Sequence, residues 1–416
     1  MNVTQRQKSL GFALLLSGAA CSPGIVGPPA DYEVDQDVDS AVNALHQPVQ
    51  ASLGRPLPFL SQADQDRFAA GKDEFEQVET PADGLGPVFN DTSCARCHSD
   101  PASGGGSSTL ETRFGAIVNG VFDPLTQLGG SLIQSQGIGP AGSCDFVGET
   151  VPSSANVVSS KRRTTPLFGL GLVDAVPEST FHYVARIESV LFPSEAGRTA
   201  TVHDIAHNRN AVGRFGWKNQ NPTLHQFSGD AYINEMGITN PEFPNENCPQ
   251  GDCASLAACN PRPDLNDDGT DVALFTDFMT LLAPPPRARL GAQAVAGKAI
   301  FASVGCTHCH WATFRTGYHP VDSLSGTVFH PYSDFLLHDM GSLGDGIVVA
   351  DGQGNEFRTA PLWGISAVKL YLHDGRATTI ADAILAHDGQ GRRARDRFAN
   401  LSSSDQAALV AFVNAL

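Results

Sequence analysis

The sequence predicts a mainly α-helical protein built from two tandem domains, with long loops and minor β-hairpin insertions. Two observations favour this fold. The pattern Cys-x-x-Cys-His occurs from Cys94 to His98 and again from Cys306 to His310. The flanking segments are also repeated: "AGKDEF" and "AGKAIF" precede the two motifs, and "RTTPLFGL" and "RTAPLWGI" follow them. Three matched landmarks in the same order indicate an internal duplication.

Residues 1–21 predict a signal segment. Arg6 and Lys8 precede a short apolar stretch, and "SGAAC" follows it, in a pattern too short to span a bilayer. We therefore expect export to the periplasm with a lipid anchor on Cys21, and cleavage at "GAA" without lipid is the alternative. Since no later stretch offers about 18 consecutive apolar residues, the sequence predicts no transmembrane helix.

Cys-x-x-Cys-His is the attachment pattern of c-type haem, in which both thiols add to the haem vinyl groups and the adjacent His binds the iron. A zinc ribbon would need its two cysteine pairs about 15 to 20 residues apart, and a thioredoxin-like pair needs no His after the second Cys. The sequence therefore predicts two covalently bound haem c groups, held by Cys94, Cys97 and His98 and by Cys306, Cys309 and His310.

The duplication divides the chain into a signal segment (1–21), an N-terminal arm (22–60), an N-terminal haem domain (61–285) and a C-terminal haem domain (286–416). Each haem domain is expected to be small, helical and cytochrome c-like, because a covalently held haem supplies much of its core. "PPP" at 284–286 stiffens the connection, since proline fixes φ. Alternation in "TRFGAIVNGVF" predicts a hairpin inserted in the first copy.

The C-terminal segment "SSSDQAALVAFVNAL" predicts a closing helix. Ser404 or a neighbouring Ser is the expected N-cap, and Leu409, Phe412, Val413 and Leu416 fall on one face.

Four further cysteines, Cys144, Cys248, Cys253 and Cys259, predict two disulfides with three connectivities open, and metal binding by these thiols is the alternative. "DLNDDGTD" at 264–271 begins like a calcium loop, but Phe275 stands at the twelfth position, where a Glu is required. We expect a polar loop, with one calcium ion as the alternative. The net charge of −17 argues against a nucleic-acid partner.

Several segments resemble a known family. "FNDTSCARCH", "PLFGLGLVDAVPE", "GRFGWK", "EMGITN", "YSDFLLHDMG" and "YLHDGRATTI" resemble the di-haem oxidoreductase and peroxidase family, related to bacterial di-haem cytochrome c peroxidases and to the methylamine-utilisation di-haem maturase. The resemblance runs from Ala70 to the C-terminus. It implies that the N-terminal haem is catalytic and that the C-terminal haem delivers electrons.

By that resemblance Trp217 bridges the haems, while Gln226 and Glu235 face the peroxide site. Peroxide cleavage needs a group that takes a proton from one oxygen and returns it to the other, and an apolar pocket raises a carboxylate pKa towards that task. The alternatives are that Glu235 is a surface carboxylate at a helix end and that Trp217 is a core residue.

The second haem requires a sixth ligand. In relatives a Met or Tyr follows a His-Asp-Gly motif at a fixed interval, and the same interval from His373 reaches His387. The resemblance implies coordination by His310 and His387, with Met340 as the competitor. The expected iron ligands are thus His98, His310 and His387.

The combined prediction is an exported di-haem c-type oxidoreductase that reduces hydrogen peroxide with electrons passed from the C-terminal to the N-terminal haem. The expected electron donor is a small cytochrome or cupredoxin, or a quinol-linked donor. The alternatives are oxidation of a protein or organic substrate by a stored high-valent haem, and pure electron transfer with both irons six-coordinate.

Overall fold

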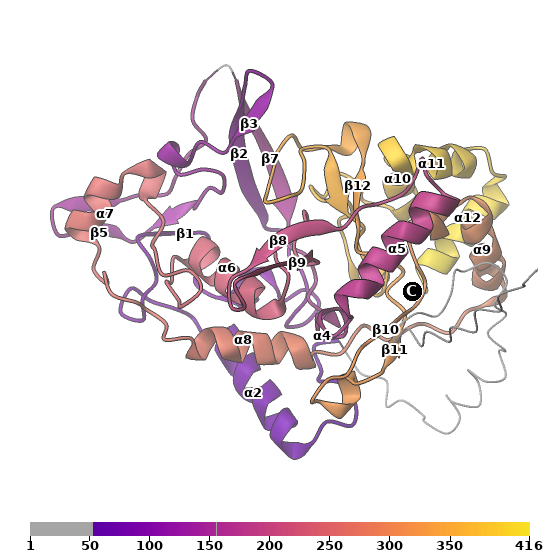
Figure 1. Ribbon diagram of the computed structural model, residues 1–416, viewed down its shortest axis with the longest axis horizontal. Coiled ribbons are helices and arrows are strands. Elements are labelled where there is room, and N and C mark those ends of the chain that lie inside the picture. The colour runs from indigo at the N-terminus through magenta and orange to yellow at the C-terminus, as the bar shows by residue number, and fades with distance from the viewer. Residues whose placement is uncertain (1–52, 155) are drawn as a thin grey trace, which may run out of the picture.

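The computed structural model describes residues 53–154 and 156–416, so the predicted signal segment, Cys21 and most of the predicted arm lie outside the described residues. Figure 1 shows α9 to α12 gathered at one end of the molecule, away from α2, α6 and α8. No helix within the described ranges is long and apolar enough to cross a membrane. The α-helices are α2 (Gln62–Glu76), α3 (Cys94–Cys97), α4 (Leu170–Asp174), α5 (Glu178–Leu191), α6 (Leu224–Met236), α7 (Cys253–Cys259), α8 (Thr270–Leu281), α9 (Ala292–Ser303), α10 (Ile380–Leu385), α11 (Arg392–Ala399) and α12 (Ser403–Val413).

Each repeated Ala-Gly-Lys segment lies in a helix that crosses a second helix closely. Gly71 of α2 packs on α8, where a Cβ at position 71 would lie 2.3 Å from the carbonyl oxygen of Leu274. Gly297 of α9 packs on α12, where a Cβ would lie 1.9 Å from the carbonyl oxygen of Ala408. Only glycine permits these approaches. The repeated sequence therefore builds two similar helix pairs, α2 with α8 and α9 with α12.

The phenylalanine of each repeated segment packs in the same way. The rings of Phe75 and Phe278 lie 4.7 Å apart between α2 and α8, and those of Phe301 and Phe412 lie 5.4 Å apart between α9 and α12. The two helix pairs therefore share an aromatic contact as well as a glycine contact.

Strands contribute more than the mainly helical prediction allowed. The described residues form six small antiparallel sheets, of which the largest has the order β3-β2-β7. The predicted hairpin is confirmed, because β2 pairs with β3. The fold is therefore mixed, since most of these strands are inserted between the helices of the first repeat. The strands are β1 (Val88–Phe89), β2 (Leu110–Val118), β3 (Val121–Asp123), β4 (Gln136–Gly137), β5 (Gly139–Ala141), β6 (Cys144–Phe146), β7 (Val157–Arg163), β8 (Ala200–Asp204), β9 (Arg209–Gly213), β10 (Phe314–Arg315), β11 (Val328–Phe329), β12 (Leu337–Asp339) and β13 (Glu356–Arg358).

The largest hydrophobic cluster includes residues from both sides of the predicted domain boundary. Phe75 and Phe278 belong to it, and so do Trp311, Phe314 and Trp363 from beyond residue 286. A second cluster surrounds the contact between α9 and α12. The boundary at 285 stays a prediction, and the segments on either side of it share one core.

The disulfide prediction is confirmed. Cys144 joins Cys259, which ties the β5–β6 hairpin to α7, and Cys248 joins Cys253. The cysteines of the two Cys-x-x-Cys-His motifs are free.

The predicted closing helix is also confirmed. Helix α12 is capped by Ser402, a neighbour of Ser404, whose side chain accepts a hydrogen bond from the backbone N–H of Asp405. Leu409, Phe412 and Val413 are buried, as the spacing predicted.

Candidate active site

The first motif places His98 directly after the short helix α3. His98 Nδ1 lies 3.1 Å from the carbonyl oxygen of Gly105. Since a carbonyl can only accept, Nδ1 carries the proton and Nε2 is left with its lone pair. The ring lies 6.0 Å from that of Phe75. Burial lowers the pKa of His98 to about 4, so the imidazole is neutral and suited to bind iron.

The second motif repeats this arrangement. His310 Nδ1 lies 2.9 Å from the carbonyl oxygen of Tyr332, and its ring lies 6.3 Å from that of Phe301. Burial, with a smaller effect from the neighbouring His387, lowers the pKa of His310 to about 4. Both predicted proximal ligands therefore present Nε2 as a free electron-pair donor.

His387 follows α10 and has the same tautomer, because Nδ1 lies 2.8 Å from the carbonyl oxygen of Ala383. His387 is also one of the groups that lower the pKa of His310. Met340, the competing ligand, lies close to His387, because both side chains are neighbours of Gly391. A Cβ added at Gly391 would lie 3.1 Å from His387 Cδ2 and 3.4 Å from Met340 Cε. Coordination by His387 stays a prediction, which the geometry supports.

Two buried arginines, one from each "RTxPL" segment, line a cavity of about 450 Å³ between the halves. Arg163 Nε donates to the carbonyl of Leu372 at 2.9 Å, and Arg358 Nε donates to the carbonyl of Gly216 at 3.0 Å. Burial lowers the pKa of each guanidinium to about 10. Their hydrogen-bond partners in the described residues are backbone carbonyls, whereas a buried cation normally requires an anion.

These features fit haem. The free cysteines have the attachment spacing, three neutral histidines offer Nε2, and the carboxylates of haem would supply the anions that Arg163 and Arg358 lack. The cavity is also lined by the aromatic rings of Phe168, Phe215, Trp217 and Trp363.

Trp217 lies where the two repeats exchange hydrogen bonds. The backbone N–H of Arg163 donates to the carbonyl of His373 at 2.7 Å, and that of Arg358 donates to the carbonyl of Trp217 at 2.9 Å. Trp217 Nε1 donates to the carbonyl of Arg163 at 3.0 Å. The indole packs edge-to-face against His373 and Phe357. Trp217 is therefore fixed between the halves, and its role as a bridge between the haems stays a prediction.

Glu235 lies in the last turn of α6, against the segment that precedes the first motif. Asn90 donates to Glu235 twice: its N–H to the backbone carbonyl at 2.7 Å and its Nδ2 to Oε2 at 2.8 Å. Burial, followed by the neighbouring Glu111, raises the pKa of Glu235 to about 8. Burial and Glu235 also raise the pKa of the Cys97 thiol, to about 12. Glu235 is thus a proton-holding carboxyl beside the first motif.

Gln226 does not meet Glu235. It lies in the first turn of α6, and nine residues of helix separate the two positions by about 13 Å. Its amide accepts from the N–H of Ile205 and donates to the carbonyl of His203 and to Asn221. These bonds connect α6 to the turn between β8 and β9, so Gln226 has a structural role here.

Sequence reasoning missed two charged residues near Glu235. Glu111 and Arg113 lie on β2, and Arg113 Nε lies 3.1 Å from Glu111 Oε1. Their i, i+2 spacing on a strand places them on one face. The sequence signal that could have identified them is this pair of opposite charges, two residues apart, where the predicted hairpin begins.

The calcium-like loop has a structural explanation. Asp267 accepts hydrogen bonds from the N–H groups of Gly269, Asp271 and Val272, so its carboxylate caps the start of α8. Among the described residues, the group close enough to hold a metal ion is Cys309, Asp334 and His338. The polar-loop interpretation is favoured.

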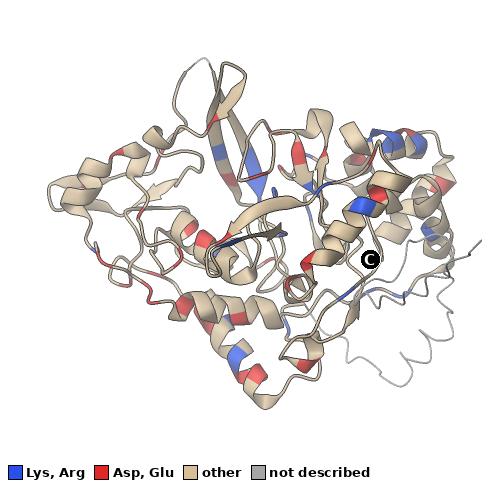
Figure 2. Ribbon diagram, in the orientation of Figure 1, with Lys and Arg blue, Asp and Glu red and all other residues tan. Residues whose placement is uncertain are grey.

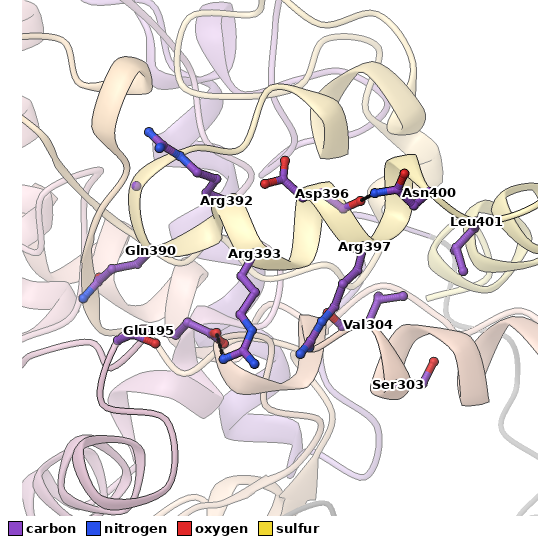
Figure 3. A pocket seen from close by; sticks show the side chains of 12 residues that line it. Glu195, Ser303, Val304, Gln390, Arg392, Arg393, Asp396, Arg397, Asn400 and Leu401 are labelled. Atoms are coloured by element: carbon purple, nitrogen blue, oxygen red, sulfur yellow. Dashed lines mark hydrogen bonds and ion pairs between the residues drawn. The ribbon is translucent and has the colours of Figure 1, made fainter.

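A second hollow, of about 710 Å³, lies beside the second motif. Figure 2 shows acidic residues spread over the molecule and a run of basic residues along α11. Figure 3 shows Arg393 of α11 directed at Glu195, with Nη1 and Oε1 3.5 Å apart. The other carboxylate oxygen of Glu195 contacts His308 inside the motif. The arginine-lined side of this hollow therefore contacts the second motif through Glu195.

Comparison with known proteins gives one family and several similar structures. The family model described as "Di-haem oxidoreductase, putative peroxidase" matches residues 149–416. Hydrazine synthase from Kuenenia stuttgartiensis is similar at 17% identity and a TM-score of 0.40, over 99% of this chain and 100% of that chain. A MauG-like protein associated with microbial copper homeostasis is similar at 14% identity and a TM-score of 0.40, over 89% and 94%. The di-haem peroxidase BthA from Burkholderia thailandensis is similar at 16% identity and a TM-score of 0.39, over 88% and 87%. No curated protein sequence matches the chain.

The family match covers more than half of the chain and contains the second motif, Trp217 and Glu235. The two Cys-x-x-Cys-His motifs and the paired cavity arginines agree with it. The chain is an oxidoreductase that uses two haems, and it belongs to the di-haem oxidoreductase and peroxidase family.

Proposed function

We propose that this protein is an exported enzyme that reduces hydrogen peroxide, with c-type haems attached at Cys94 and Cys97 and at Cys306 and Cys309. When bound, the two haems supply the iron chemistry and the electron storage, with electrons passing from the second to the first. The single observation that carries the proposal is Glu235, a half-buried carboxyl of raised pKa beside the first motif.

The protein residues have separate tasks in this proposal. Glu235 holds a proton at physiological pH and releases it to the leaving oxygen, a role that suits a carboxyl whose pKa lies near the working pH. Asn90 orients the carboxyl through its bond to Oε2. Trp217 is buried on the wall of the cavity between the repeats, where its indole would exclude water from the contact between them.

The electron donor is proposed to be a small redox protein that docks over the hollow beside the second motif. Arg392, Arg393 and Arg397 line this hollow, so they would favour a donor with acidic groups around its redox centre. The predicted signal segment supports a periplasmic location, with Cys21 as the proposed lipid anchor.

One observation favours a second function, oxidation of another substrate. His387 is half-buried and offers Nε2 near His310, and a bis-His haem has a lower potential than a His/Met haem. A low-potential second haem would be a poor acceptor for a high-potential donor. Electrons would then come from a low-potential donor, or the enzyme would take them from a protein or organic substrate.

The test is peroxide turnover by the holoprotein after Glu235→Gln. We expect turnover to fall by roughly 10²-fold or more, with both haems still attached. Glu246→Gln is the matched control, because burial also raises the pKa of Glu246 to about 8. Unchanged turnover in Glu235→Gln would remove this residue from the mechanism. An electron paramagnetic resonance spectrum with both irons six-coordinate would instead support pure electron transfer.

A further inference from the structure

Two carboxyl groups meet at the end of α6. The side chain of Glu111 lies within hydrogen-bond reach of that of Glu235. Two ionised carboxylates can only accept and would repel each other, so a hydrogen bond between them requires that one carries a proton. Asn90 donates to Glu235 Oε2 and fixes the orientation of that carboxyl. The pair therefore contains one acid and one carboxylate.

The surroundings decide which member is the carboxylate. Arg113 donates to both oxygens of Glu111, with Nε 3.1 Å from Oε1 and Nη2 3.4 Å from Oε2. Burial alone would raise the pKa of Glu111, but Arg113 and Arg162 lower it below its usual value. Within the described ranges Glu235 makes no ion pair, and the raising effects of burial and of the Glu111 charge on its pKa come before the lowering effect of Arg113, so the proton resides on Glu235.

We propose that Glu111 is a positioning residue that keeps the shared proton on Glu235, and that Arg113 makes this possible by holding the negative charge on Glu111. The inference rests on the proposed function, because this proton is meant for peroxide. Reduction of hydrogen peroxide to two waters consumes two protons and two electrons. The donor supplies the electrons, the pair supplies one proton from the Glu235 carboxyl, and solvent supplies the other proton.

The charged groups around the pair come from four elements. Arg162 of β7 faces Glu111, and Asp230 of α6 faces Arg113. Asp91 and Cys97 lie on the side of the first motif. When Glu235 loses its proton, the pair carries two negative charges. Arg113 offsets them directly through its ion pair with Glu111, whereas Arg162 acts from nearby because its own hydrogen bonds go to Asp345. An acid next to a carboxylate that is ion-paired with Arg113 can therefore release its proton and take it back.

The proton can be followed without measuring turnover. A protonated carboxyl has an infrared carbonyl band that a carboxylate lacks, so a pH titration of this band in the holoprotein reports which form Glu235 takes. Glu235→Gln identifies its component in difference spectra, which should titrate near pH 8 in the parent protein. Glu246→Gln, which removes a different half-buried carboxyl of raised pKa, should leave that component in place.

Two substitutions should move the titration in opposite directions. Glu111→Gln removes the like charge and leaves Arg113 facing Glu235, so the midpoint should fall by about 2 pH units. Arg113→Gln removes the cation, so the midpoint should rise. A substitution that merely disturbed the structure would not give opposite shifts, and haem content and circular dichroism report whether each variant is folded. An unchanged midpoint in folded Glu111→Gln would overturn the inference.

The outcome separates this inference from the proposed function. If the midpoint shifts as expected but the holoprotein does not reduce peroxide, the proton pair stands and peroxide is the wrong substrate. The other case is that peroxide is reduced, but the fall of turnover at alkaline pH in Glu111→Gln does not shift together with the midpoint of its infrared titration. The carboxyl pair then does not supply the proton, and the inference fails.

Discussion

Gly297→Ala tests whether the duplicated helix pair depends on close backbone contact. In an exposed helix this change would raise the free energy of unfolding by about 1 kcal/mol, because alanine favours the helix. At position 297 the new Cβ would lie 1.9 Å from the carbonyl oxygen of Ala408, whereas ordinary contact begins at 3.4 Å. A backbone carbonyl cannot rotate away as a side chain can, so α9 and α12 must separate by about 1.5 Å.

That separation also disturbs the contact between Phe301 and Phe412. Overpacking of a core costs about 1–3 kcal/mol, so after the helix gain we expect a net loss of about 1–2 kcal/mol. Urea unfolding of the holoprotein, followed by circular dichroism, measures it. Ala296→Gly, at an exposed position of the same helix, gives the helix-propensity effect alone. A Gly297→Ala protein as stable as the parent would refute the close contact.

Three further predictions concern ligation, pH and the disulfides. Replacing His387 with Met should raise the potential of one haem and add the near-infrared sulfur-to-iron band, and a parent protein that already shows this band would point to a thioether ligand instead. Raised pKa values of about 8 for Glu235 and about 9 for Glu188 mean that the folded state retains protons that the unfolded state loses above its ordinary pKa of 4.5. These protons therefore stabilise the folded state fully below pH 4.5, and the stabilisation decreases as the pH rises and is gone once the pH passes 8 to 9. The melting temperature should accordingly fall from pH 6 to pH 9, and a constant melting temperature would contradict the two shifts. Replacing Cys144 and Cys259 with Ser opens a loop closed across 115 residues and should lower the free energy of unfolding by about 2–5 kcal/mol, whereas an unchanged urea midpoint would show that the bridge adds no stability.

The sequence by itself determined the features that depend on local spacing. A haem attachment motif is five residues long, so both motifs and their histidines could be identified directly. The repeated glycine and phenylalanine of α2 and α9 indicated the duplication, and the structure shows the reason: each pair makes the same close contact with a second helix. The hairpin and the closing helix followed from periodicity, which is also local.

Tertiary structure alone decided the features that join distant segments. Glu111 and Glu235 are more than a hundred residues apart in the chain, and only the folded arrangement brings their carboxyls together. Gln226 was expected to face the same site as Glu235, but it bonds to Ile205 and His203 and lies at the other end of the helix. The pairing of the four disulfide cysteines was likewise decided only by the fold. Side chains that meet through packing leave no pattern along the chain, so their partners, their charge and their pKa values follow only from the folded arrangement.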